Sequence, residues 1–191
     1  MATINDPNSN VSARVTIRGI ATDARSADEK AVMGGVAYSI PIAATTPSGA
    51  ANFFFYLENR STTAGLCIPR IRMRAASAEV ISIYVGQVPV SPSADIPTEI
   101  TVVGRNSTST SPTGEIFAVR DADLATVEAA GGGGILGYLS CATAAVDFLW
   151  EDPIILRPNG TLALLAAAGS IALSGTVTAF RCSAFDDTYV G

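Results

Sequence analysis

The feature that most constrains the fold is an alternation of apolar and polar residues with a period of two. Residues 13–20 alternate valine or isoleucine with arginine or threonine, and residues 38–42 alternate tyrosine or isoleucine with serine or proline. Successive side chains of a β-strand point to opposite faces, so this pattern predicts half-buried strands. Residues 122–130 are the one stretch that fits a helical turn. The alternation therefore predicts an all-β chain.

Turn signals divide the chain into about ten or eleven short segments, at the spacing of 8–12 residues that is typical of an antiparallel β-sandwich or barrel. Residues 75–77 join two segments closely enough for a hairpin, and Pro41 favours an edge strand or a bulge. Residues 157–160, Arg-Pro-Asn-Gly, predict a tight turn with positive φ. The segments are residues 13–20, 38–42, 52–59, 66–74, 78–87, 99–104, 115–120, 135–141, 148–156, 161–167 and 175–185.

A chain of 191 residues has room for one domain with a sizeable core. We expect a β-sandwich domain over residues 37–191, preceded by an extended N-terminal arm over residues 1–36. Hydrophobic residues make up 48% of the chain and charged residues 15%, against about 25% charged in typical soluble proteins. So little charge cannot cover the whole surface, and we expect part of it to pack against other protein chains.

The net charge argues against nucleic acid as a partner, and the length of the apolar stretches argues against a membrane. The net charge is −5, whereas binding to phosphates requires a basic footprint. The longest apolar stretch, residues 162–173, is interrupted by Gly169 and Ser170 and is shorter than the roughly 20 residues of a membrane-spanning helix. Residues 1–12 are polar and predict no secretion signal.

Several residue types that catalysis and metal binding require are scarce. Histidine is absent, which removes the commonest general base and the commonest zinc ligand. An odd number of cysteines without paired spacing, Cys67, Cys141 and Cys182, predicts reduced, buried thiols. Serine and threonine are abundant but lack a histidine to activate them. We therefore expect no enzymatic activity and no cofactor.

Two further patterns are of the kind found in binding or catalytic sites, but both are better explained without such a site. Gly131–Gly134 precede Ile135 and Leu136, and no lysine with a hydroxyl residue follows as in a phosphate loop, so a surface loop or a close approach of another chain is favoured. Paired acidic residues suit general acid–base catalysis or calcium, but none has the spacing of a calcium loop, and solvated carboxylates are favoured. The pairs are Asp121/Asp123, Glu151/Asp152 and Asp186/Asp187.

Eight residues are candidates for contact with other molecules. The aromatic run Phe53, Phe54, Phe55 and Tyr56 predicts a strand that is buried on both faces or lies at an interface. Trp150 is suited to stacking on a sugar, or to a core or an interface.

The other three candidates, Arg70, Arg72 and Arg74, alternate with Ile71 and Met73, so they share one face of a strand. They are suited to a phosphate or an acidic glycan, to solvent, or to carboxylates of an adjoining subunit. The sequence leaves these alternatives open.

Residues 152–162 give an apolar strand, a Pro-x-Gly turn and a second strand that begins with a polar residue. Together with the aromatic run and the arginine-rich strand after it, this order resembles small structural proteins of tailed-phage virions. The resemblance covers residues 37–187. It implies a jelly-roll-like β-sandwich.

Two roles are implied by this resemblance. The first is a capsid decoration or cement protein, a homotrimer that is made in the host cytoplasm, lies on the outer surface of the virion and bridges major capsid protein subunits. The second is a tail fibre or spike component whose sandwich binds a carbohydrate receptor through exposed aromatic residues such as Trp150 or Tyr138.

A third hypothesis, independent of the resemblance, is a glycan hydrolase, which requires two carboxyl groups about 5–9 Å apart in a cleft.

Overall fold

The computed structural model describes residues 2–5, 12–16, 19–22, 36–86, 98–105, 114–124 and 134–182. For the first three of these ranges and for residues 150–152 it describes the backbone alone. Every regular element in these ranges is a β-strand, which confirms the prediction of an all-β chain. Of the helical turn predicted over residues 122–130, the described residues 122–124 are not helical, and the rest lie outside the described ranges.

The first three strands form an antiparallel sheet of their own. Strands β1 (Ala2–Asn5), β2 (Ser12–Thr16) and β3 (Gly19–Thr22) follow one another in this sheet in sequence order. The expectation of one strand over residues 13–20 is wrong, because β2 and β3 pair with each other and Val15 lies opposite Ile20. The two strands are separated by only two residues of sequence, so the alternating pattern is almost unbroken and did not reveal that there are two strands.

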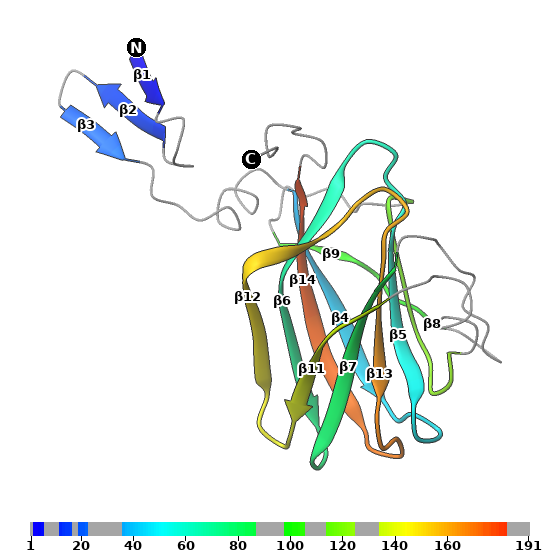
Figure 1. Cartoon of the computed structure of the whole chain (residues 1–191). Coiled ribbons are helices and arrows are strands. Elements are labelled where there is room, and N and C mark those ends of the chain that lie inside the picture. Colours follow the sequence, from blue (N-terminus) through cyan, green and yellow to red (C-terminus); the bar gives the residue numbers. More distant parts are fainter. Residues whose placement is uncertain are drawn as a thin grey trace.

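The other strands form two antiparallel sheets packed face to face, which confirms the predicted β-sandwich (Figure 1). The six-stranded sheet has the order β11-β7-β13-β5-β10-β8, and the five-stranded sheet has the order β12-β6-β14-β4-β9. Their bounds are β4 (Ala37–Thr45), β5 (Asn52–Asn59), β6 (Gly65–Ala75), β7 (Glu79–Gly86), β8 (Thr98–Glu99), β9 (Val103–Gly104), β10 (Ile116–Arg120), β11 (Gly134–Cys141), β12 (Val146–Leu156), β13 (Thr161–Ala166) and β14 (Leu173–Cys182).

Four strand pairs are nested within one another. Strand β4 pairs with β14, β5 with β13, β6 with β12 and β7 with β11, so the earliest strand of the sandwich pairs with the last and the innermost pair closes the series. The pairs alternate between the sheets. β4/β14 and β6/β12 lie in the five-stranded sheet, and β5/β13 and β7/β11 lie in the six-stranded sheet. Most sheet contacts therefore join residues that are far apart in sequence.

The hydrophobic core lies between the two inner faces. It is built from the apolar positions of the alternating strands, so that Ile40, Ile71 and Val177 from one sheet meet Ile83 and Leu164 from the other, all of them fully buried. Burial of a branched or aromatic side chain stabilises the fold by about 1.5–3 kcal/mol, so this cluster is the main stabilising element of the sandwich.

A second apolar cluster lies on the outer face of the six-stranded sheet. Phe53 packs edge-on against Tyr84 with ring centroids 5.1 Å apart, and Tyr56 packs against Phe117 at 6.5 Å. The guanidinium of Arg60 lies 3.8 Å from the centre of the Phe117 ring. Strand β5 is thus apolar on both faces, which explains its continuous hydrophobic sequence.

The predicted hairpin across residues 75–77 is wrong. Strands β6 and β7 lie in different sheets, and the connection between them crosses the end of the sandwich. Backbone hydrogen bonds hold this crossing in place, from the N–H of Ala75 to the carbonyl of Ala142 and from the N–H of Ala76 to the carbonyl of Ala172. A short polar connection is compatible with either a hairpin or a crossing, and the sequence pattern does not separate them.

Two local predictions are confirmed. In the turn over residues 157–160, Asn159 has a φ of 63°, and the N–H of Gly160 donates to the carbonyl of Arg157 at 2.7 Å. A Cβ on Gly160 would lie 2.8 Å from that carbonyl oxygen, so glycine is required there. In the described part of the chain, β9 pairs with Tyr38 and Ser39 of β4 and does not extend to Pro41, which therefore lies at the margin of its sheet there.

Candidate functional site

Exposed apolar side chains occur on β11 and β12, the terminal strands of the two sheets on the same side of the sandwich. Ile135 and Tyr138 lie on the outer face of the six-stranded sheet, and Leu149 and Ile155 lie on that of the five-stranded sheet. A Cβ on Gly137 of β11 would lie 3.7 Å from the ring of Phe148 on β12, which shows how close the two strands come. Among the described residues, neither strand has a second strand neighbour. The exposed residues of this apolar edge are Ile135 (45%), Leu136 (50%), Tyr138 (61%), Leu149 (68%) and Ile155 (53%).

Bulges interrupt both strands of the apolar edge. On β12 the register jumps between Leu149, opposite Arg70, and Ile154, opposite Ile68, so that five steps along β12 match two along β6. On β11 the register shifts between Ile135 and Gly137. Bulges disfavour the addition of another strand through backbone hydrogen bonds. A partner at this edge would therefore pack mainly against side chains.

The three arginines of β6 lie on the outer face of the five-stranded sheet, as their alternation predicted. Arg70 donates two hydrogen bonds to the carboxylate of Asp147 on β12, from Nε at 2.9 Å and from Nη2 at 2.8 Å. Arg72 lies 3.7 Å from the same carboxylate, and Arg74 is exposed. Part of this positive charge is thus neutralised within the chain.

The aromatic run is buried within the chain itself. Phe54 and Phe55 belong to the main core, and Phe53 and Tyr56 belong to the second cluster, with no more than 5% of any of the four exposed. Of the two alternatives for this run, the structure shows the strand that is buried on both faces. The backbone of Trp150 lies in β12 at the bulge, and its side chain is outside the described part of the chain.

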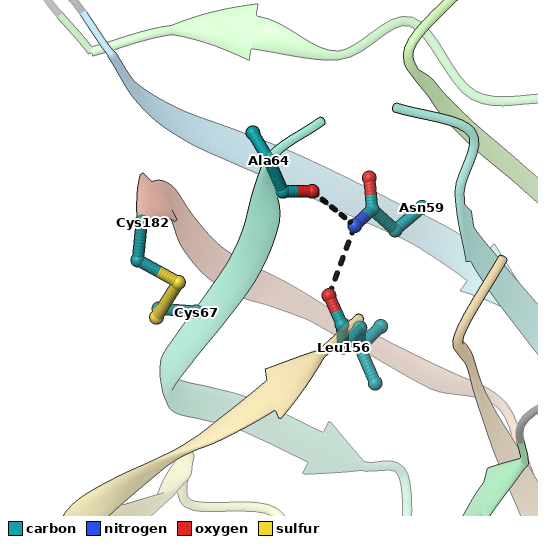
Figure 2. The surroundings of a disulfide bond; sticks show 5 residues. All are labelled: Asn59, Ala64, Cys67, Leu156 and Cys182. Carbon is teal, nitrogen blue, oxygen red and sulfur yellow. Dashed lines mark hydrogen bonds between the residues drawn. A yellow bond between two sulfur atoms is a disulfide. The ribbon is translucent and has the colours of Figure 1, made fainter. Parts of the chain in front are cut away.

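The prediction that all three cysteines are reduced is wrong. Cys67 on β6 and Cys182 at the end of β14 form a disulfide across neighbouring strands and 115 residues of sequence (Figure 2). The pairing depends on strand order, which cysteine spacing does not encode. Cys141 is a buried free thiol, as expected. Burial, and secondarily the charge of Glu79, raises the pKa of the Cys141 thiol to about 11.

Asn59, a residue that sequence reasoning did not single out, joins three segments at one end of the sandwich. Its side-chain nitrogen donates to the carbonyls of Ala64 and Leu156, both at 2.9 Å (Figure 2), and its side-chain oxygen accepts from the N–H of Ser61 at 3.1 Å. The only sequence signal was a polar residue ending an apolar strand. All hydrogen-bonding groups of this buried amide are satisfied.

A half-open cavity of about 430 Å³ lies beside this amide. It is bordered by the end of β7 and by the turn between β12 and β13. Among the described residues that line it, Arg157 is the one with a charged side chain, and none carries a nucleophilic group. The lining residues are Val85, Gly86, Ile155, Leu156, Arg157, Pro158 and Gly160.

Glu79 is a buried carboxylate that sequence reasoning also missed. Its Oε1 accepts from the N–H groups of Val80 at 2.9 Å and Ala168 at 3.0 Å, and so joins β7 to the loop after β13. Its Oε2 is buried and has no hydrogen-bond partner among the described residues. Cys141 lies directly opposite on β11. The sequence signal for this role was weak, because a glutamate at the start of a strand is usually solvated.

Acidic residues do not gather into a metal site in the described ranges. No group of three or more histidine, cysteine, aspartate or glutamate side chains is placed to hold a metal ion there. Asp121 instead accepts a hydrogen bond from the N–H of Asp123 in a loop. The side chains of Glu151 and Asp152, the pair Asp186/Asp187 and residues 131–133 of the glycine run lie outside the described ranges. No helix in those ranges is long and apolar enough to cross a membrane.

Comparison with protein families, with curated proteins and with solved structures finds no match to this chain.

Proposed function

We propose that this chain is a structural protein of a tailed-phage virion, of the capsid decoration or cement type, that assembles as a homotrimer on the major capsid protein. The observation that carries the proposal is the apolar edge: five large side chains, 45–68% exposed, on two adjacent edge strands. Water-exposed apolar area of this kind is typical of surfaces that a partner covers.

The strand order supports the same proposal. Eight of the strands form four nested antiparallel pairs distributed over two packed sheets, which supports the jelly-roll-like sandwich that we propose. Jelly rolls are frequent in viral capsid and lectin domains, and they also host unrelated functions, so this support is an analogy of fold. The proposed mechanism is mechanical: apolar area shared between subunits must be exposed again before the shell can separate.

The test uses capsids that lack the protein and purified full-length chain. We expect the chain to sediment as a trimer, to remain bound to the capsids through a density gradient, and to raise the temperature at which they break. If substitutions in the apolar edge left capsid binding unchanged, the assigned surface would be wrong. If the chain did not remain on the capsids at all, the decoration role would be wrong.

A matched pair of variants locates the surface. Leu149→Asp combined with Tyr138→Asp places two charges in the apolar edge and should abolish trimer formation and capsid retention. Val103→Asp is the control, because Val103 is similarly exposed, at 51%, but lies on β9 at the opposite margin of the five-stranded sheet. Both proteins should unfold at temperatures close to that of the unsubstituted chain, since all three positions are on the surface.

Tyr138 favours a second candidate function, the carbohydrate-binding tail fibre or spike component. The residue is 61% exposed, on the outer side of an edge strand, where its ring can stack on a sugar. Glycan binding that is lost in Tyr138→Ala, together with no retention on capsids, would favour this candidate over the first.

A further inference from the structure

The outer face of the five-stranded sheet carries three arginines in a row, each directly opposite a hydroxyl side chain. The pairs are Arg70 with Thr178, Arg72 with Thr176 and Arg74 with Ser174, on the neighbouring strands β6 and β14. The intervening Ile71 and Met73 are fully buried in the core, so the three guanidinium groups point away from it on the same side. We call Arg70, Arg72 and Arg74 the arginine row.

The arginine row has more positive charge than the described side chains around it neutralise. Of the described side chains on this face, Asp147 is the one carboxylate, and it is engaged mainly by Arg70. Arg72 is 3.7 Å from it with a side chain 53% exposed, and Arg74 makes no ion pair with a described residue. Among the side chains that the structure describes, three cations against one anion leave a local excess of two positive charges, on a chain whose net charge is −5.

The spacing of the row matches an extended polypeptide. Alternate residues of a strand are about 6.6–6.8 Å apart, so a second extended chain lying along β6 would present the carboxylates of every second residue with the same repeat. Guanidinium groups bind carboxylates through two parallel hydrogen bonds, and the neighbouring hydroxyls supply further donors. Leu149, 68% exposed and directly opposite Arg70, adds an apolar contact of the kind that protein interfaces combine with arginine.

We propose that the arginine row binds an extended acidic segment of a partner protein, with aspartate or glutamate on alternate residues. The arginine row adjoins the apolar edge, and Leu149 belongs to the apolar edge and lies opposite Arg70. The proposal stands whether or not the chain comes from a virion. A long, uniformly charged polyanion is less suited, because the row holds only three cations and the negative net charge of the chain repels the remainder.

Two synthetic peptides of equal composition test the spacing. Fluorescence anisotropy would compare a labelled twelve-residue (Glu-Thr)6 peptide with (Glu-Glu-Thr-Thr)3, which cannot place carboxylates on every second residue along one face. With the full-length chain at low salt we expect the alternating peptide to bind more tightly by about fivefold, and the difference to shrink as salt rises. Equal affinity for the two peptides would overturn the proposal, as would tighter binding of a heparin fragment than of the alternating peptide.

Three variants test the residues. Arg72→Gln combined with Arg74→Gln should weaken binding of the alternating peptide by about tenfold, the loss expected for two exposed charge pairs. Asp147→Asn should strengthen it by about threefold, because it releases Arg70 from its internal carboxylate. Arg157→Gln, in the turn between β12 and β13, is the control and should leave binding unchanged. Unaltered affinity in the double variant, or weaker binding in Asp147→Asn, would contradict the assignment of the arginine row. Retention of the same variants on capsids is measured as well, and it tests the proposed function separately.

Discussion

The side-chain amide of Asn59 donates a 2.9 Å hydrogen bond to the backbone carbonyl of Leu156, which lies 97 residues further along the chain. Asn59 ends β5 in one sheet and Leu156 ends β12 in the other, so this bond joins the two sheets at one end of the sandwich. Backbone bonds reinforce the junction, from the N–H of Asn59 to the carbonyl of Gly160 and from the N–H of Asn159 to the carbonyl of Asn59. The turn over residues 157–160 is thus held by a residue far from it in sequence.

Asn59→Ala should lower the free energy of unfolding by about 2–4 kcal/mol, because it removes three hydrogen bonds and leaves buried backbone groups without partners. Urea denaturation would measure the loss. Asn52→Ala is the matched control. Among the described residues the Asn52 side chain bonds to Ser48 alone, in an exposed position, so its loss should cost less than about 0.5 kcal/mol.

Asn59→Asp separates hydrogen bonding from shape. At neutral pH a carboxylate would face the carbonyl oxygens of Ala64 and Leu156 and destabilise the fold at least as much as alanine does. Burial and this repulsion raise the pKa of the introduced carboxyl group in the folded state above its unfolded value, so stability should be regained as pH falls below that raised pKa. A variant whose stability relative to the unsubstituted chain does not change with pH would contradict the geometry at Asn59.

The disulfide between Cys67 and Cys182 should stabilise the sandwich by fixing the last strand. It closes a loop of about a hundred residues, for which the loss of unfolded-state entropy is worth roughly 2–5 kcal/mol. Cys67→Ser combined with Cys182→Ser, or reduction of the unsubstituted chain, should lower the free energy of unfolding by that amount.

Thiol counting checks the pairing independently of stability. Denatured, unreduced protein should react with one equivalent of a thiol reagent per chain, through Cys141, and with three after reduction. Three reactive thiols in protein that was purified and denatured without reductant would show that the pair does not form.

The features of this structure that the sequence predicted are those set by residues close together in the chain. Alternation and turn chemistry are local, so strands such as β13 and the turn over residues 157–160 could be predicted. The order of strands is not local: the short connection after Ala75 leads to the other sheet, and Cys67 meets Cys182 only because β6 and β14 are neighbours. The arginine row was visible from alternation, whereas its partial neutralisation by Asp147 depends on the pairing of β6 with β12.

Glu79 should be required for stability as a hydrogen-bond acceptor. Glu79→Ala leaves the N–H groups of Val80 and Ala168 without an acceptor and opens a cavity, and should cost about 2–4 kcal/mol of unfolding free energy. Glu79→Gln keeps an oxygen in the accepting position and should cost less than Glu79→Ala in the same urea titration. The reverse order would show that the negative charge, and not the accepting oxygen, stabilises this corner.

The buried Cys141 thiol should make the folded sandwich less stable at alkaline pH. Its thiol has a pKa of about 11 in the folded state and a reference value of 9.0, so between these values the unfolded chain binds fewer protons than the folded one. Stability should therefore fall as pH rises from 9 toward 11, by at most about 1.4 kcal/mol per pH unit from this group.

The Cys141 contribution can be isolated by comparison with Cys141→Ala. The difference in unfolding free energy between the two proteins should narrow as pH rises above 9, because the variant lacks the titrating thiol. Labelling of the native protein by a thiol reagent at pH 8.5 should be slow, since less than about 1% of a thiol with this pKa is thiolate there. Rapid native-state labelling, or parallel stability profiles for the two proteins, would mean that the Cys141 thiol is solvated in the folded state and not buried.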